Sequence, residues 1–281
     1  MNTALWPAPA KLNLFLHVVG RRADGYHLLQ TVFQFLDYGD ELRFAVRDDG
    51  KIRRTAGLSG VAEHQDLTVR AAALLKQVGG IAPGVDIAVT KRLPMGAGLG
   101  GGSSDAATTL VAMNRLWRLN LPEEKLAELG LQLGADVPVF VRGRAAWAEG
   151  VGERLTPLEL PEPWYVVVAP PCHVSTAEIF AAPELTRNAP PITIAAFLSG
   201  AGSNQCEAAV CGRYPEVGRA LAWLGEYAPA RMSGTGAAVF APFPEEAEAR
   251  RVAAAVPAAW QAFVAQGRNR SPLHERLMKE A

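Results

Sequence analysis

Alternation of apolar and polar residues predicts that the chain begins with strands. Over residues 12–19 the side chains alternate with a period of two, which indicates a strand with one buried face. A turn over residues 21–27 follows this strand. Further strands are expected over residues 30–38, 41–46, 51–55, 85–89, 143–152, 164–169, 229–232, 237–241 and 259–265.

A spacing of three to four residues between apolar positions predicts the helices. The clearest helix carries Leu110, Met113 and Trp117 on one face. Another begins at Asp66 and stops at two glycines, Gly79 and Gly80. Other helices are expected over residues 122–134, 175–181, 192–198, 204–212, 215–225 and 245–255.

A proline-rich segment over residues 155–163 interrupts both patterns and predicts a domain boundary. The sequence therefore predicts an N-terminal domain over residues 1–157 and a C-terminal domain over residues 158–281. Strands alternate with pairs of helices in the second part, which indicates a small two-layer α+β domain.

A glycine-rich loop lies between the strand at 85–89 and the helix that carries Leu110. Glycine adopts positive φ without a Cβ clash, so such a loop can turn several N–H groups toward one point. The helix N-terminus behind it adds unpaired N–H groups and a favourable dipole, which together attract phosphate. The predicted phosphate loop comprises Pro94, Met95, Gly96, Ala97, Gly98, Leu99, Gly100, Gly101, Gly102, Ser103 and Ser104.

Three other interpretations of this loop are possible. A Walker A motif needs a lysine after its last glycine, but Ser103 follows Gly102. The dinucleotide fingerprint matches from Gly96 to Gly101, yet six residues separate Gly96 from the strand before it and no acidic strand end follows. An idle surface turn is disfavoured because so many glycines lose backbone entropy on ordering. A nicotinamide-dependent oxidoreductase remains the alternative from another class.

Three polar residues are candidates for chemistry. Lys11 and Asn13 lie two residues apart on one strand and therefore share a face, where they could stabilise charge beside a phosphate. Asp136 lies in an apolar segment bounded by proline, where a carboxylate is costly unless it is paired or used. It is a candidate general base, with a helix cap as the alternative. Composition alone favours a hairpin with Tyr26 packed and His27 exposed.

Composition excludes several classes of protein. The 281 residues are 49% hydrophobic and 20% charged, which is typical of a globular enzyme. Lys plus Arg and Asp plus Glu both number 28, so no basic field is available to hold nucleic acid. Three cysteines at irregular spacing predict reduced thiols rather than disulfides or a zinc site. Without a signal-peptide pattern or a long apolar run, the chain is expected to be cytoplasmic, away from membranes, with no obligate protein partner.

Three segments, at residues 9–14, 94–107 and 233–240, resemble in order and spacing the signature motifs of the GHMP small-molecule kinases. Residues 22–27 and 134–140 resemble the branch whose small-molecule substrate carries a cytidine diphosphate group. The resemblance implies a two-domain α+β GHMP-kinase fold with the active site in the inter-domain cleft. It also implies that ATP, with Mg²⁺, phosphorylates the 2-hydroxyl of a compound of the non-mevalonate isoprenoid pathway. A GHMP kinase for mevalonate-type or homoserine-type substrates is the nearest alternative.

The resemblance also assigns roles to residues on the phosphate side. The ATP phosphates would lie on the phosphate loop and adenine near Lys91 and Asp66, where relatives often carry Asn in place of Asp66. Asp136 would take the proton of the substrate hydroxyl, and Lys11 would steady Asp136 and the developing charge. Ser104 is a candidate Mg²⁺ ligand, and the other metal ligands are unassigned.

On the substrate side, the resemblance overrides the hairpin interpretation. Tyr26 and Phe180 would stack on either side of the cytosine ring, and His27 would hydrogen-bond to its edge. Asn13 would position the substrate, and Thr176 would line the site.

Overall fold

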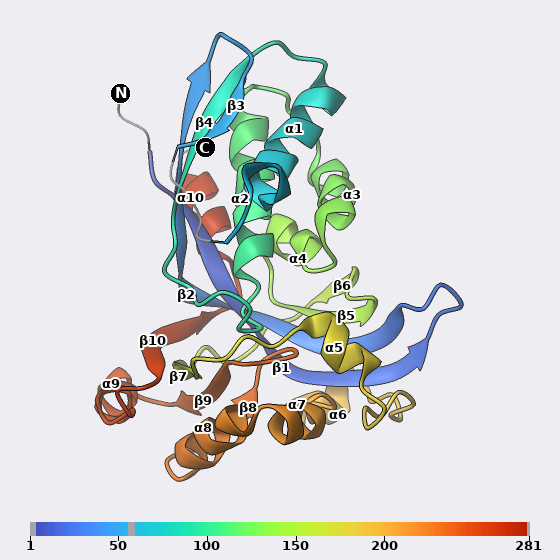
Figure 1. Cartoon of the computed structure of the whole chain (residues 1–281), viewed down its shortest axis with the longest axis vertical. Helices are drawn as coiled ribbons and strands as arrows, with labels where there is room; N and C mark the ends of the chain where they lie inside the picture. The colour runs from blue at the N-terminus through green and yellow to red at the C-terminus, as the bar shows by residue number, and fades with distance from the viewer. Residues whose placement is uncertain (1–3, 56–59, 280–281) are drawn as a thin grey trace.

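Two long antiparallel strands form the frame of this computed structural model, which describes residues 4–55 and 60–279. Strands β1 (Trp6–Arg21) and β2 (His27–Arg47) pair along nearly their whole length and run through the molecule (Figure 1). The predicted strands at 30–38 and 41–46 are therefore one strand. It continues through Gly39, where a Cβ would lie 2.2 Å from the carbonyl oxygen of Ala8, so glycine permits the close approach of β1.

Strand β2 connects the two halves of a ten-stranded sheet. It pairs with β1, β4 (Gly84–Thr90), β5 (Ala146–Gly150) and β10 (Gln261–Arg268), and β10 continues into β7 (Trp164–Ala169), β9 (Val239–Phe243) and β8 (Arg231–Met232). Strand β3 (Ile52–Arg54) lies parallel to β4, and β6 (Arg154–Pro157) pairs with β5. Because one sheet crosses the whole molecule, both helical layers are fixed to a common support.

The first helical layer covers the β2–β4 end of the sheet (Figure 1). It consists of α1 (Leu67–Gly79), α2 (Gly101–Leu116), α3 (Glu123–Leu133) and α4 (Val137–Arg142), preceded by the 3₁₀ turn η1 (Glu63–Gln65). Its core joins Leu110 of α2 and Phe140 of α4 to Phe35 and Leu42 of β2. Burying a large apolar side chain stabilises the fold by roughly 1.5–3 kcal/mol, so this core fixes the start of α2.

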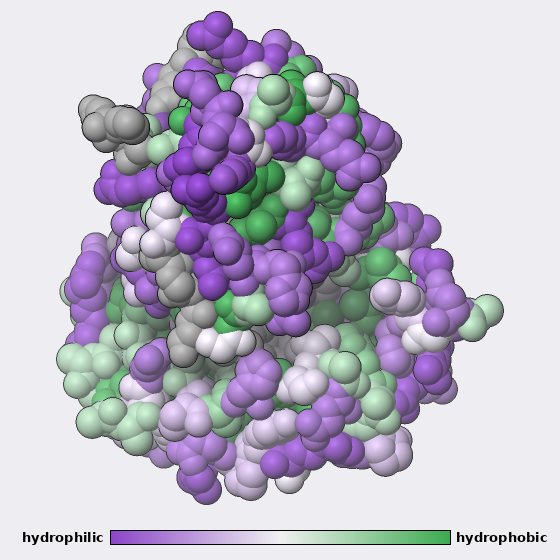
Figure 2. Space-filling view, turned by 45° about the horizontal axis from the view of Figure 1, so that its top comes forward, coloured by the Kyte–Doolittle hydropathy of each residue, from purple (hydrophilic) through white to green (hydrophobic). Residues whose placement is uncertain are grey.

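The second layer covers the β7–β9 end of the sheet. It consists of α5 (Thr176–Ala181), α6 (Ile194–Leu198), α7 (Glu207–Arg213), α8 (Pro215–Gly225) and α9 (Glu246–Ala254). Val166 and Val239 of the sheet pack there with Leu224 of α8, and Leu16 of β1 reaches the same core. In Figure 2 the surface narrows between the two layers.

Two helices of the structure were not predicted from the sequence. Helix α4 is six residues long and begins with a proline, so it is too short to display a helical period. Helix α10 (Pro272–Lys279) follows the last strand, packs on β1 and buries Leu273 in the first core. The C-terminal segment thus returns to the first layer. None of the helices in residues 4–55 and 60–279 combines the length and the apolar character of a membrane-spanning segment.

Candidate active site

A cavity of about 1090 Å³ lies between the two layers and collects nearly all the predicted site residues. Its wall is formed by helix α2, the residues just before α4, strand β1, the β1–β2 turn and helix α5. The predicted residues that line it are Lys11, Asn13, Tyr26, His27, Asp66, Lys91, Asp136, Thr176, Phe180 and the phosphate loop from Pro94 to Ser103. The fold therefore brings together residues that are far apart in sequence.

The phosphate loop has the backbone conformation that its glycines predict. Gly96, Gly98 and Gly100 have φ of 67°, 74° and 73°, and Gly100 directly precedes the first turn of α2. A Cβ on Gly98 would lie 2.3 Å from the carbonyl oxygen of Ser233, so no side chain fits there. Gly101, Gly102 and Ser103 of the first turn of α2 line the cavity, and the N–H groups of a first helical turn have no partner within the helix, as an anion site requires.

A lysine and a carboxylate meet beside this loop. The Nζ of Lys11 lies 3.4 Å from Oδ2 of Asp136 and 3.2 Å from the carbonyl oxygen of Gly98, and it donates to Oδ1 of Asn13. The Lys11 side chain is only 4% exposed, whereas that of Asp136 is 34% exposed. The ammonium is therefore held inside the wall, and the carboxylate beside it is accessible from the cavity.

A second glycine-bearing turn, which carries Ser233 and Thr235, contacts both the phosphate loop and β1 from the second layer. The Ser233 hydroxyl donates to the carbonyl oxygen of Gly98 at 2.9 Å and accepts from the Asn13 N–H at 3.1 Å. Thr235 of the same turn shares a hydrogen bond of 2.9 Å with Thr176 at the start of α5. Sequence analysis found this turn as a motif but named none of its residues in the site, because a short turn carries no signal of what it contacts.

The far end of the cavity is aromatic. The rings of His27 and Phe180 stack with centroids 4.9 Å apart and an interplanar angle of 18°. Tyr26 stands at the tip of the turn and is 63% exposed. The composition-based expectation that Tyr26 is packed and His27 exposed is therefore wrong. The turn closes through the Arg22 N–H and the Tyr26 carbonyl, which leaves Tyr26 outside and directs His27 toward α5.

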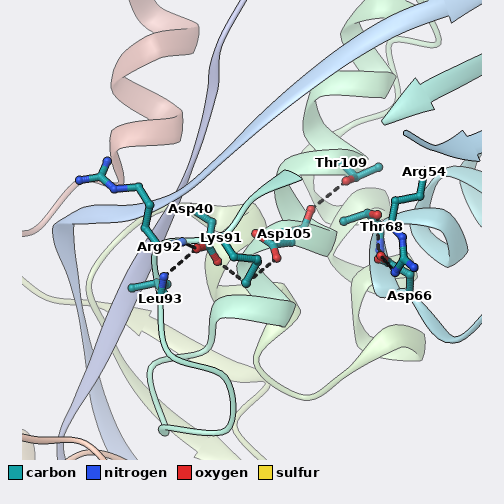
Figure 3. A network of polar contacts seen from close by, with 9 residues as sticks. All are labelled: Asp40, Arg54, Asp66, Thr68, Lys91, Arg92, Leu93, Asp105 and Thr109. Atoms are coloured by element: carbon teal, nitrogen blue, oxygen red, sulfur yellow. Dashed lines mark hydrogen bonds and ion pairs between the residues drawn. The ribbon is translucent and has the colours of Figure 1, made fainter. Parts of the chain in front are cut away.

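Lys91 and Asp66, the two residues expected near adenine, are engaged in internal ion pairs (Figure 3). The Lys91 ammonium contacts Oδ2 of Asp105 at 2.9 Å and pairs with Asp40. Asp66 accepts from Arg54 at 2.9 Å and caps α1. Both residues line the cavity, and their contact with adenine remains a prediction.

Asp105 is a buried acid of the site that sequence analysis did not select. Burial, with the nearby charge of Asp40, raises its pKa to about 7 despite the opposing charge of Lys91. Its second carboxylate oxygen, Oδ1, is buried with no hydrogen-bond partner among the described residues. The available signal was an acid in the second turn of the helix whose N-terminus is predicted to bind phosphate, where a negative charge is unexpected.

This raised pKa predicts a pH-dependent stability. The folded state binds the Asp105 proton more tightly than the unfolded state does. The contribution of this proton to the free energy of unfolding is therefore present at low pH and declines as the pH rises toward and through 7. Between pH 5.5 and 8 the decline should be on the order of 2 kcal/mol. Urea unfolding of the wild type and of Asp105→Asn at both pH values measures it. The same slope in both proteins would contradict the prediction.

Ser104 occupies a different position from its neighbours in the loop. It is fully buried, and its hydroxyl has no hydrogen-bond partner among the described residues. The described ranges also contain no cluster of three His, Cys, Asp or Glu residues that could hold a metal ion. Mg²⁺ in nucleotide sites is held largely by phosphate and water, with one or two carboxylates, so such a cluster is not required. A role for Ser104 toward Mg²⁺ stays a prediction.

Comparison with known proteins agrees with this geometry. Models of the GHMP kinase N-terminal and C-terminal domains match residues 66–144 and 194–262. A protein of Alkalilimnicola ehrlichii named 4-diphosphocytidyl-2-C-methyl-D-erythritol kinase is 62% identical over 98% of this chain and 94% of its own length. A protein of Nitrosococcus oceani with the same name is 58% identical over 98% of both chains.

Solved structures give the same result for the fold. A crystal structure of 4-(cytidine 5'-diphospho)-2C-methyl-D-erythritol kinase superposes with a TM-score of 0.82 at 35% identity, covering 94% of this chain and 99% of the other. The mevalonate kinase of Methanococcus jannaschii, at 14% identity and a TM-score of 0.67 over 95% and 98% of the two chains, shares the fold alone. The expected α+β GHMP-kinase fold is thereby confirmed. The chain belongs to the 4-diphosphocytidyl-2-C-methyl-D-erythritol kinase family of the GHMP kinases.

Proposed function

We propose that this protein transfers the γ-phosphoryl group of ATP to the 2-hydroxyl of 4-diphosphocytidyl-2-C-methyl-D-erythritol. One observation carries the proposal: the Lys11–Asp136 pair lies in the same cavity as the phosphate loop and the His27–Phe180 stack. A phosphate donor and the reacting hydroxyl of a substrate that carries a nucleobase can thus be placed around one carboxylate. The names of the relatives support the same substrate.

The residues around Asp136 would supply what phosphoryl transfer asks of a protein, which is positioning and charge stabilisation. Asp136 accepts the hydrogen bond, and then the proton, of the substrate hydroxyl. The buried Lys11 ammonium holds that carboxylate in place and stabilises negative charge that develops nearby. ATP supplies the phosphoryl group, and Mg²⁺ bound with it would neutralise phosphate charge.

The aromatic end of the cavity would hold the cytosine ring. Phe180 and Tyr26 offer faces for stacking, and the edge of His27 offers a hydrogen bond. Asn13, fixed by its amide contact to Thr31 at 2.9 Å, would position the substrate, and Thr176 would line the pocket. This end is separate from the phosphate loop, so damage to it should affect only one of the two substrates.

Truncating either aromatic residue should weaken binding of the cytidine substrate alone. Base–aromatic stacking contributes roughly 1–3 kcal/mol, so Phe180→Ala and Tyr26→Ala should each raise the KM for that substrate several-fold or more. The KM for ATP should stay unchanged. Tyr227→Ala, which truncates an exposed aromatic residue outside the cavity, is the matched control. Equal damage to both KM values would indicate a packing role instead.

A direct assay tests the function. The protein is incubated with ATP and Mg²⁺ and, in turn, with 4-diphosphocytidyl-2-C-methyl-D-erythritol, mevalonate and homoserine while ADP is followed. ADP should form with the cytidine compound alone. Turnover of mevalonate or homoserine instead would assign another GHMP activity, and tight NAD(P)H binding would support the oxidoreductase alternative.

We also propose the division of the chain into an ATP-binding domain at 1–157 and a second domain at 158–281. The two separate cores support it, because the first is built mainly by residues before 157 and the second mainly by residues after 158. There are exceptions on both sides: helix α10 packs in the first core, and Leu16 and Val18 of β1 lie in the second.

A further inference from the structure

One arginine joins the end of helix α5 to the first residue of β2. The guanidinium of Arg187 donates to the carbonyl oxygens of Phe180, Ala182 and Leu185 at 3.0, 2.6 and 3.1 Å. A fourth N–H, that of Nε, donates to Nε2 of His27 at 3.3 Å. Three carbonyl contacts fix the guanidinium plane, so the direction of the fourth N–H is set by the backbone.

This contact determines where the imidazole carries its proton. A guanidinium has five N–H donors and no acceptor, so the His27 nitrogen that faces it must be the acceptor. In a neutral ring, the proton then resides on the other nitrogen, Nδ1. Nδ1 has no hydrogen-bond partner among the described residues, and His27 lines the cavity. Stacking on Phe180 holds the ring plane.

We propose that Arg187 is a positioning residue that fixes His27 as the neutral Nδ1–H tautomer, so that His27 presents a hydrogen-bond donor to an acceptor atom of the cytosine ring. The proposal rests on the proposed substrate. Cytosine offers two such acceptors, its ring nitrogen N3 and its carbonyl oxygen O2. With the proton on Nε2 instead, the same nitrogen of His27 would be an acceptor and would face these atoms without a bond.

The charges around His27 keep it neutral. Burial and the positive charges of Arg187 and Arg21 lower its pKa below the ordinary value. Arg21 faces it as its partner in the β1–β2 register. The carboxylates nearby are engaged elsewhere: Asp24 pairs with Arg22, and Glu178 of α5 pairs with Arg213. Over the neutral pH range the imidazole of His27 is therefore uncharged, and its contact with Arg187 determines which tautomer it adopts.

The tautomer can be measured without any substrate. Nitrogen-15 NMR of histidine-labelled wild-type protein at pH 8 distinguishes a protonated Nδ1 from a protonated Nε2, and the spectrum of His27→Gln assigns the signal. We expect Nδ1 to be protonated. A signal from His27 with Nε2 protonated would overturn the proposal, whatever the enzyme phosphorylates.

Replacing Arg187 should change substrate binding in a pH-dependent manner. In Arg187→Met the neutral ring divides between tautomers, and only the Nδ1–H fraction is competent, so the KM for the cytidine substrate should rise about five- to ten-fold at pH 8. The variant loses the Arg187 charge, one of the causes that lower the His27 pKa, so its His27 gains a proton at a higher pH than in the wild type. At pH 5.5 the imidazolium carries N–H on both nitrogens, which restores the donor, so the KM should fall back toward the wild-type value. The KM for ATP should not change.

The pH dependence separates this role from mere support of α5. Damage to α5 would raise the KM equally at pH 5.5 and pH 8, and that result would overturn the proposal. Arg213→Met is the control, because it removes an arginine that pairs with Glu178 of α5 but does not contact His27, and its KM values should match the wild type. If Arg187→Met does not fold, the wild-type NMR spectrum alone tests the proposal, because it shows which nitrogen of His27 carries the proton. An enzyme inactive toward every cytidine compound would refute the proposed function, yet the spectrum would still test the tautomer.

Discussion

Turnover should fall by about 10²–10⁴-fold when Asp136 is replaced by Asn, while both substrates still bind. Asn keeps the shape of the side chain and its hydrogen-bonding capacity, but it cannot accept the proton of the substrate hydroxyl. It also leaves the ammonium of Lys11, 3.4 Å away and nearly buried, without its carboxylate. Steady-state kinetics gives turnover, and calorimetric titration with each substrate checks binding.

A double-mutant cycle tests whether the pair acts as a unit. Lys11→Ala should also be slow, and the variant with both changes should be much less impaired than the product of the single effects. Asp49→Asn is the control, since Asp49 forms an ion pair with Arg47 outside the cavity. Retention of more than about a tenth of turnover by Asp136→Asn would fall below the usual general-base effect. In that case Asp136 would only orient the hydroxyl, which a loose transition state permits.

The phosphate loop could be predicted because its signal is local. Positive φ at Gly96, Gly98 and Gly100 and the start of α2 right after Gly100 depend on residues adjacent in sequence. The pairing of Lys11 with Asp136 is different, because 125 positions separate the two residues and neither shows in sequence what it faces. Their meeting was expected only from family resemblance.

Other features of the site escaped sequence analysis for physical reasons. Asp105 resembles any acid in a helix until burial beside Asp40 and Lys91 changes its pKa. Arg187 lies in an irregular segment before two prolines, and its role depends on three carbonyl groups at the end of α5 and in the segment that follows it. Periodicity detects neither kind of contact, because both are made across the fold rather than along an element.

Gly98→Ala should cause the largest loss of ATP binding and activity among changes in the loop. The added Cβ would lie 2.3 Å from the backbone oxygen of Ser233, so the two loops must separate. Separation would break the contacts of the Gly98 carbonyl with the Ser233 hydroxyl and with the Lys11 ammonium. A displacement of about 1 Å in a catalytic arrangement can cost on the order of 10²-fold in rate. We therefore expect turnover to fall at least that far and ATP affinity to fall with it.

A control variant separates close approach from backbone strain. Gly80 also has positive φ, 58°, but a Cβ there would meet no atom within 4 Å and it lies outside the cavity. Gly80→Ala should lose only about 1 kcal/mol of unfolding free energy, from the left-handed conformation, and keep full activity. Calorimetric titration with ATP, kinetics and urea unfolding compare the two variants with the wild type. If Gly98→Ala bound ATP as Gly80→Ala does, the loop would not be a phosphate cradle held by its contact with Ser233, and the placement of Lys11 by the Gly98 carbonyl would lose its support.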